Sequence, residues 1–228
     1  MCGVTVNAYY LDEHRDGSDG DAFAAAMLDA GMEAIRICTE AYGSYPYNEL
    51  DIVEGYFWYA GMENAGYVQI SSNMAGFMGY GDGRSVDIVV VHEVAHQWFP
   101  FIIGNDQYTD SWLDEGFATF TTLLFKRSFM TDVAFANQLD FEPPPKHINL
   151  PLEHYVGDHA PIIYNGGAMF LWRIMTEMGE DTFYEMTRAY YSAFSFKEVK
   201  TSDFINLLRE WSSGVNVENI ISAYISEP

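Results

Sequence analysis

The first half of the chain alternates between strand-like and helix-like patterns. Residues 4–11 alternate in strand fashion, and the Asp-Gly-Ser-Asp-Gly stretch at 16–20 predicts a loop. From 21 to about 42, apolar residues recur at mostly helical spacing. Two more strand-like runs, 50–53 and 66–71, flank a segment rich in aromatic residues and glycine. This half is therefore predicted to be mixed α/β with a small sheet.

The second half is predicted to be almost entirely helical. After a glycine-rich loop at 80–83, the run 86–99 predicts a buried helix, although its Val-Asp-Ile-Val-Val-Val start is also compatible with a strand. Helical blocks follow at 112–129, 132–140, 163–178, 181–194, 202–212 and 217–225. Because no repeat or long linker interrupts the chain, we expect one domain over 1–228. Its α/β lobe (1–110) and helical lobe (111–228) would share a cleft.

Composition and charge narrow the possible partners. Of 228 residues, 49% are hydrophobic and 16% aromatic, which excludes disorder as a description of the whole chain. The net charge of -22 would repel phosphate backbones and anionic lipids, so no nucleic acid partner is expected. No apolar run is long enough for a membrane span, so this segment is expected to make no membrane contact. The cellular compartment is left open.

A metal site is indicated by the H-E-x-x-H motif at 92–96. On a helix, the spacing of four residues projects His92 and His96 from one face, about one turn apart. Glu93 is rotated about 100° from His92, where its carboxylate can reach a water on the metal without binding the metal. Catalytic zinc needs a third protein ligand, and Glu115 offers it 19 positions after His96 in the next helical block. We therefore expect one zinc ion per chain.

These motifs resemble the gluzincin zinc aminopeptidases of the aminopeptidase N and leukotriene hydrolase type, whose pattern is H-E-x-x-H, eighteen residues, then Glu. The segments 89–99 and 112–119 are also similar to family segments. The resemblance implies an α+β, thermolysin-like catalytic domain with its active site between the two lobes. Family members carry further domains around this unit, which implies that flanking domains absent from this chain complete the substrate pocket.

Two further segments carry implied site residues. Residues 60–64 resemble the exopeptidase motif G-A-M-E-N but depart at the first two positions; the resemblance assigns substrate binding to Gly61, Met62, Glu63 and Asn64, with Glu63 on the free amino group. Residues 164–168 resemble Y-x-K-G-A, which implies that Tyr164 stabilises the oxyanion. Tyr155 is the weaker candidate for that role.

Several positions depart from the family pattern. Gly166 replaces the lysine of Y-x-K-G-A, Asp114 replaces the asparagine of W-L-N-E-G, and Pro100-Phe101 stands where Gly-Asn is usual. No departure touches an expected metal ligand.

The sequence thus predicts a zinc aminopeptidase that removes N-terminal residues from peptides through a metal-activated water, with Glu93 as the general base. The alternatives are a non-catalytic zinc- or peptide-binding scaffold of the same fold, an epoxide hydrolase and an endopeptidase. His14, His147, His154 and His159 have no ligand-like spacing and are expected to be surface or capping residues.

Overall fold

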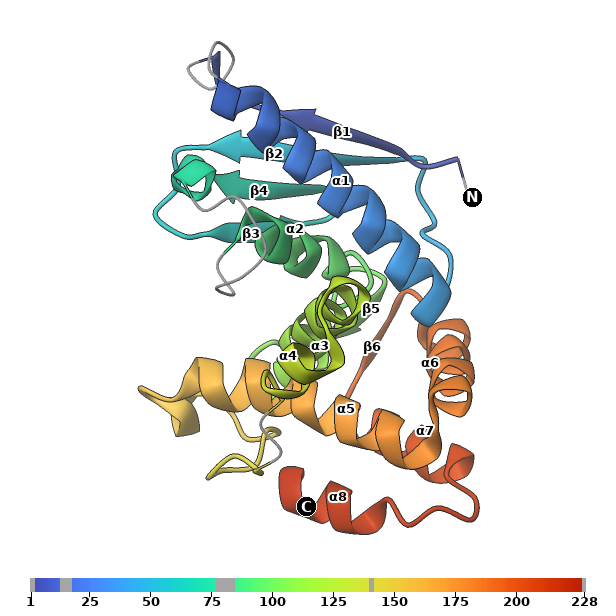
Figure 1. Ribbon diagram of the computed structural model, residues 1–228. Coiled ribbons are helices and arrows are strands. Elements are labelled where there is room, and N and C mark those ends of the chain that lie inside the picture. The colour runs from blue at the N-terminus through green and yellow to red at the C-terminus, as the bar shows by residue number, and fades with distance from the viewer. Residues whose placement is uncertain (1–2, 13–17, 77–84, 140–141, 227–228) are drawn as a thin grey trace.

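The computed structural model describes residues 3–12, 18–76, 85–139 and 142–226 and has the predicted α+β architecture (Figure 1). The strands are β1 Thr5–Tyr9, β2 Glu49–Gly55, β3 Gly61–Asn64, β4 Tyr67–Ser71, β5 Ile103–Asn105 and β6 Lys197–Val199. The α-helices are α1 Ser18–Ala41, α2 Val86–Ala95, α3 Trp112–Phe129, α4 Asp132–Ala136, α5 Gly167–Met178, α6 Glu180–Phe194, α7 Thr201–Trp211 and α8 Glu218–Tyr224. Short 3-10 turns form η2 Ser72–Gly76 and η3 Leu152–Tyr155, and a π-helix forms η4 Ala160–Gly166.

A four-stranded mixed sheet forms one end of the molecule. The strand order is β1-β2-β4-β3, with β1, β2 and β4 parallel and β3 antiparallel at the edge. Leu50 and Ile52 of β2 are fully buried, as are Val68 and Ile70 of β4. Helix α1 runs across this buried face and packs against α2 (Figure 1). The sheet is therefore covered by helices on one face, and its edge strand β3 lies against α2.

Strand β3 corrects the prediction for residues 61–64, which were expected in the segment between two strands. Four residues are too few to establish a period of two. They pair with β4 through a tight turn in which Gly66 has φ +82°, a value that suits glycine. The turn thus brings a segment without strand-like alternation alongside β4, where it forms the edge strand of the sheet.

The helical predictions are confirmed with shifted ends. Helix α2 stops at Ala95 rather than 99, and His96 caps it with right-handed backbone. The amides of Gln97 and Trp98 bond to carbonyls three positions earlier rather than four, so the chain leaves the α-helix as turns. Pro100 limits any further helix, because proline disfavours helical backbone at the residue before it, Phe99. Helix α4 ends at Ala136, and the helix expected from 163 begins as the π-helix η4. The predicted loop at 80–83 lies outside the described residues.

The pairing of β5 with β6 was missed. These three-residue strands lie far apart in the sequence and pair in parallel. Such short runs show no local pattern, and only the approach of distant segments creates them. The otherwise helical C-terminal part therefore contains one strand among its described residues. No described helix has the length and apolar character needed to cross a bilayer.

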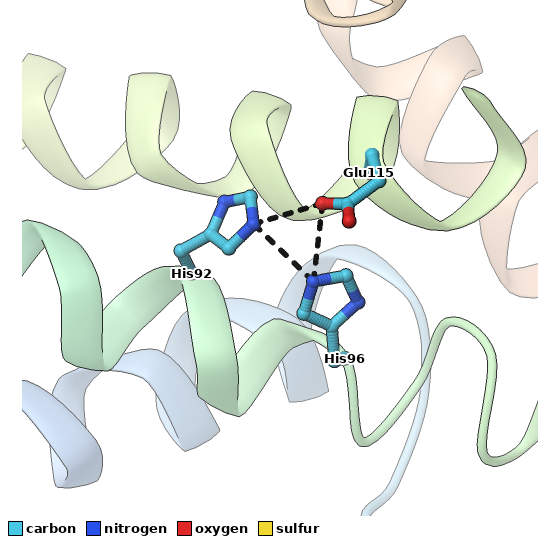
Figure 2. A group of neighbouring side chains, drawn as sticks. All are labelled: His92, His96 and Glu115. Atoms are coloured by element: carbon cyan, nitrogen blue, oxygen red, sulfur yellow. Dashed lines mark hydrogen bonds and ion pairs between the residues drawn. The ribbon is translucent and has the colours of Figure 1, made fainter. Parts of the chain in front are cut away.

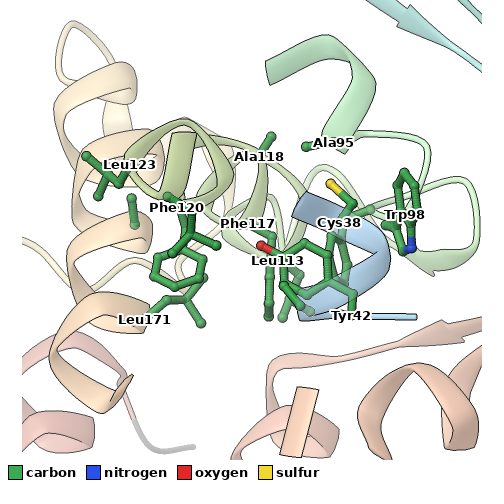
Figure 3. Close-up of a cluster of buried hydrophobic side chains, with 14 of the residues drawn as sticks. Cys38, Tyr42, Ala95, Trp98, Leu113, Phe117, Ala118, Phe120, Leu123 and Leu171 are labelled. Atoms are coloured by element: carbon green, nitrogen blue, oxygen red, sulfur yellow. The ribbon is translucent and has the colours of Figure 1, made fainter. Parts of the chain in front are cut away.

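A continuous aromatic core joins the sheet side to the helical side. Figure 3 shows Cys38 and Tyr42 of α1 close to Trp98 and Phe117. The Phe99 and Phe117 rings stack with centroids 4.1 Å apart. Cys38 is a free, buried thiol, whereas Cys2 lies outside the described residues. Because this core extends from the end of α2 into α3, it fixes how these two helices lie relative to each other.

Candidate metal centre

Helices α2 and α3 bring the three expected ligands to one point (Figure 2). His92 Nε2 lies 3.2 Å from His96 Nε2 and 3.1 Å from Glu115 Oε2, and His96 Nε2 lies 3.4 Å from the same oxygen. Four-coordinate zinc with bonds of roughly 2.0–2.1 Å separates its ligand atoms by about 3.3 Å. The triangle of donor atoms therefore has the size that a tetrahedral zinc ion requires.

The hydrogen bond of His96 fixes which ring nitrogen faces the metal. Its Nδ1 lies 2.7 Å from the Phe99 carbonyl oxygen, which can only accept, so Nδ1 carries the proton. In the neutral imidazole, the form that binds a metal, this leaves the lone pair of Nε2 toward His92 and Glu115. Acceptor atoms held this close repel one another, and a cation between them would remove that repulsion. The side chains of His92 and Glu115 are each 16% exposed, so the site is open to solvent on one side.

The electrostatic environment keeps the glutamate ligand ionised. Burial raises the pKa of Glu115, but hydrogen bonds from His92 and His96 prevail and hold this pKa well below its usual range. Burial lowers the pKa of His92. It also opposes protonation of His96, but the hydrogen bond to Glu115 raises the pKa of His96 to about 9. Glu115 therefore offers a full negative charge to a divalent cation.

Glu93 and Glu63 lie beside this triangle. Each offers a carboxylate oxygen that, with a ring nitrogen of His96, forms a group of atoms within 4.8 Å of one another. Burial raises the pKa of Glu93 to about 8 in the metal-free protein, and a cation nearby would oppose this shift. The site thus combines a ligand triangle with two further carboxylates.

Alternation along β3 divides the four residues expected to bind substrate. Gly61 and Glu63 lie on the face that meets α2, and Met62 and Asn64 lie on the opposite face. The Met62 side chain is 37% exposed. The structure therefore brings Gly61 and Glu63 to the metal triangle, but not the side chains of Met62 and Asn64.

Tyr164 lies directly over the ligands. Its hydroxyl donates to Glu115 Oε1 at 2.6 Å, and its ring is parallel to that of His92 with centroids 5.7 Å apart. Burial raises the pKa of Tyr164, so the phenol keeps its proton. Tyr155 instead bonds within its own loop, donating to the His147 carbonyl and accepting from the Leu150 amide. Its geometry supports a structural role, whereas Tyr164 reaches the metal centre.

Two departures from the family pattern have local explanations. A Cβ on Gly166 would lie 3.1 Å from side-chain atoms of both Pro144 and Ile148, so this loop covers the position where the family has lysine. Asp114 is buried, accepts from Gln107 at 2.7 Å and accepts the amide of Glu115 at 2.9 Å. Both positions are thus accommodated without moving a ligand.

Gln97 is a structural contributor that sequence reasoning missed. Its fully buried amide donates to the Asn64 carbonyl at 2.8 Å and accepts the Gly66 amide at 2.8 Å. These bonds connect the residue after His96 to the β3–β4 turn. The adjacency of Gln97 to the H-E-x-x-H motif was the available signal, but its partners could be found only in three dimensions.

Backbone contact between two glycines places Tyr164 against Glu115. A Cβ on Gly167 would lie 2.8 Å from the Cα of Gly116, and a Cβ on Gly116 would lie 3.0 Å from the Cα of Gly167. Gly116 follows the ligand Glu115, and Gly167 lies one turn after Tyr164. This close crossing of α3 and the start of α5 allows the hydroxyl to reach the ligand.

Gly167→Ala is expected to destabilise the protein by about 1–3 kcal/mol, because the added methyl group forces two backbones apart. In an ordinary helix the same change stabilises by about 0.5–1 kcal/mol, so the expected sign is reversed. Urea unfolding of both proteins measures the difference. Gly104→Ala is the matched control, since the atom nearest to its Cβ is 3.4 Å away. A Gly167→Ala variant as stable as the wild type would show that the crossing is not tight.

Comparison with known proteins gives consistent matches. Residues 26–224 match the family described as "Peptidase family M1 domain". The chain is similar to Aminopeptidase M1-D of Oryza sativa subsp. japonica, with 27% identity over 216 residues that cover 86% of this chain and 25% of the relative. It is similar to Glutamyl aminopeptidase of Rattus norvegicus, with 31% identity over 158 residues that cover 63% of this chain and 17% of the relative.

The fold also matches a solved structure. The M1 zinc metallopeptidase from Deinococcus radiodurans has a TM-score of 0.69 at 22% identity, covering 87% of this chain and 44% of that chain. The chain thus spans about a quarter of the length of the first rice relative and less than half of the solved chain.

Proposed function

The chain belongs to peptidase family M1, and from this premise we propose that it is the zinc-binding catalytic unit of an aminopeptidase. One observation carries the proposal. Three donor atoms of His92, His96 and Glu115 lie 3.1–3.4 Å apart on a solvent-open site, with the Glu93 carboxylate beside them. A closed structural zinc site would instead use all four positions for protein ligands. The residues therefore suit a metal that takes part in chemistry.

One zinc ion per chain fits this donor set, since two imidazoles and one carboxylate are a ligand set of catalytic zinc. When bound, zinc supplies a Lewis acid that polarises a carbonyl and makes water more acidic. Peptide substrates are consistent with a relative, because a mutant of the Deinococcus radiodurans protein is described as bound to a Tyr-Ser-Ala substrate. The donor atoms thus support zinc, and the relative supports peptides as the substrate class.

The residues around the metal would divide the remaining tasks. Glu93 accepts the proton of the attacking water and passes it to the leaving amine, as a carboxylate that a nearby cation keeps ionised can do. Tyr164 keeps its proton, and its single O–H would turn from Glu115 Oε1 to donate a hydrogen bond to the developing oxyanion. Glu63 holds the substrate ammonium by a charge-assisted hydrogen bond, with Gly61, Met62 and Asn64 shaping the strand around it. With the amino group held by Glu63, the first peptide bond of the substrate lies at the metal and is the one hydrolysed.

The catalytic unit comprises residues 1–228, with an α/β lobe at 1–110 and a helical lobe at 111–228. The relatives extend well beyond the matched region. Flanking domains like those of the relatives would complete the pocket around the substrate. Activity is therefore best tested with the full-length protein beside this chain.

Selectivity for a free amino group tests the proposal. The protein should hydrolyse an alanyl fluorogenic amide at least about 100-fold faster than its N-acetylated form, because acetylation removes the charge that Glu63 binds. Glu63→Gln should reduce this ratio mainly through a higher KM. Equal rates on both substrates would indicate an endopeptidase, and no peptide turnover by the zinc-loaded full-length protein would leave the scaffold or epoxide alternatives.

A further inference from the structure

Gly61 lies where strand β3 meets the side chain of Glu93. A Cβ built on Gly61 would lie 2.5 Å from Oε1, 2.6 Å from Cγ and 2.7 Å from Cδ of Glu93. Non-bonded carbon atoms prefer separations of about 3.5–4.0 Å. The outer half of the Glu93 side chain therefore occupies the space that any side chain at position 61 would need.

Within the described part of the chain, packing rather than hydrogen bonding holds the Glu93 carboxylate. The residue is only 7% exposed, and it forms no hydrogen bond with any other described residue. Buried carboxylates are ordinarily held by several donors. Without them, the carboxylate is held where it is by the surfaces around it, and the backbone of Gly61 is one of these surfaces.

Strand β3 is a rigid support for this contact. Gly61 pairs with Ile70 and Glu63 pairs with Val68, both fully buried residues of β4. Gly61 and Glu63 point to the same face and lie about 7 Å apart along the strand. The strand that presents Glu63 therefore also limits where the Glu93 carboxylate can lie.

We propose that Gly61 is a positioning residue for Glu93: the absence of a side chain at this position sets the location of the general base relative to the metal ligands. The inference rests on the proposed function of Glu93. Position 61 is alanine in the G-A-M-E-N pattern, so a general base beside that pattern must leave room for a Cβ. In this chain Glu93 fills that room, so Gly61→Ala should displace the base.

Gly61→Ala tests the inference, with Gly104→Ala as the matched control. The atoms in conflict are the far end of a flexible side chain, so the variant should fold and Glu93 should move. We expect kcat on an alanyl fluorogenic amide to fall about 100-fold, because a displacement of about 1 Å is enough for such a loss. KM and zinc content should stay within about twofold of wild type, since Glu63 and the three ligands are untouched.

A merely structural role for Gly61 would lower stability and zinc content and would leave kcat per bound zinc unchanged. A kcat within about threefold of wild type would therefore overturn the inference. Crystal structures of the two proteins provide a second measurement that needs no turnover, with the Glu93 carboxylate displaced in the variant. If the wild type has no peptidase activity, the proposed function fails, and an unmoved carboxylate in these structures would separately refute the positioning role.

Discussion

Glu93→Gln is expected to lower kcat by about 100- to 10,000-fold while leaving one zinc ion bound per chain. Glutamine has the shape of glutamate but cannot accept and return a proton, so it removes general base catalysis alone. The ligand triangle of His92, His96 and Glu115 includes no atom of Glu93. Loss of turnover without loss of metal would therefore identify the proton carrier.

Steady-state kinetics and metal analysis on the same preparation make this test direct. Glu210→Gln on the exposed face of α7 is the control, because it makes the same chemical change far along the chain from the metal ligands. Turnover by Glu93→Gln within about tenfold of wild type would remove Glu93 from the mechanism.

His96→Ala is expected to abolish stoichiometric zinc binding, and hydrolysis with it. The substitution removes one of three ligands, and it also removes the donor to the Phe99 carbonyl, a loss of about 1–3 kcal/mol in a buried site. Because zinc binds the folded state, adding it should raise the Tm of the wild type but not of the variant.

Metal content after zinc reconstitution and the zinc-dependent Tm shift measure this effect. His154→Ala is the matched control, since His154 is exposed and its described hydrogen bonds, from Lys146 to its carbonyl and from its own amide to the Pro151 carbonyl, both use backbone atoms of His154. Retention of about one zinc per chain by His96→Ala would show that the ligand triangle is wrong.

The grouping of the three candidate ligands could be predicted from sequence because their spacing is local. His92 and His96 need only one helical turn to face the same way, and Glu115 needs only the next helix to pack alongside. The α+β architecture followed from equally local patterns, namely alternation before residue 72 and helical periodicity after residue 112. Helix α3 begins and ends at the predicted residues.

The contacts that refine the site could not be predicted, because they join distant backbones. Nothing local indicates that Gly116 and Gly167 meet, or that the Glu93 side chain lies on Gly61. The three-residue strands β5 and β6 form only by pairing with each other. Gln97 stands next to a recognised motif, yet its two partners lie more than thirty residues earlier.

The buried amide of Gln97 fixes the distance between strand β3 and helix α2. Separating α2 from the β3–β4 turn would break two hydrogen bonds inside the protein, at a cost of about 1–3 kcal/mol for each group left unpaired. Thermal motion should therefore carry the zinc helix and the strand bearing Glu63 together as one rigid body. The distance from the proposed ammonium site at Glu63 to the proposed zinc site is then set by the fold before any peptide binds.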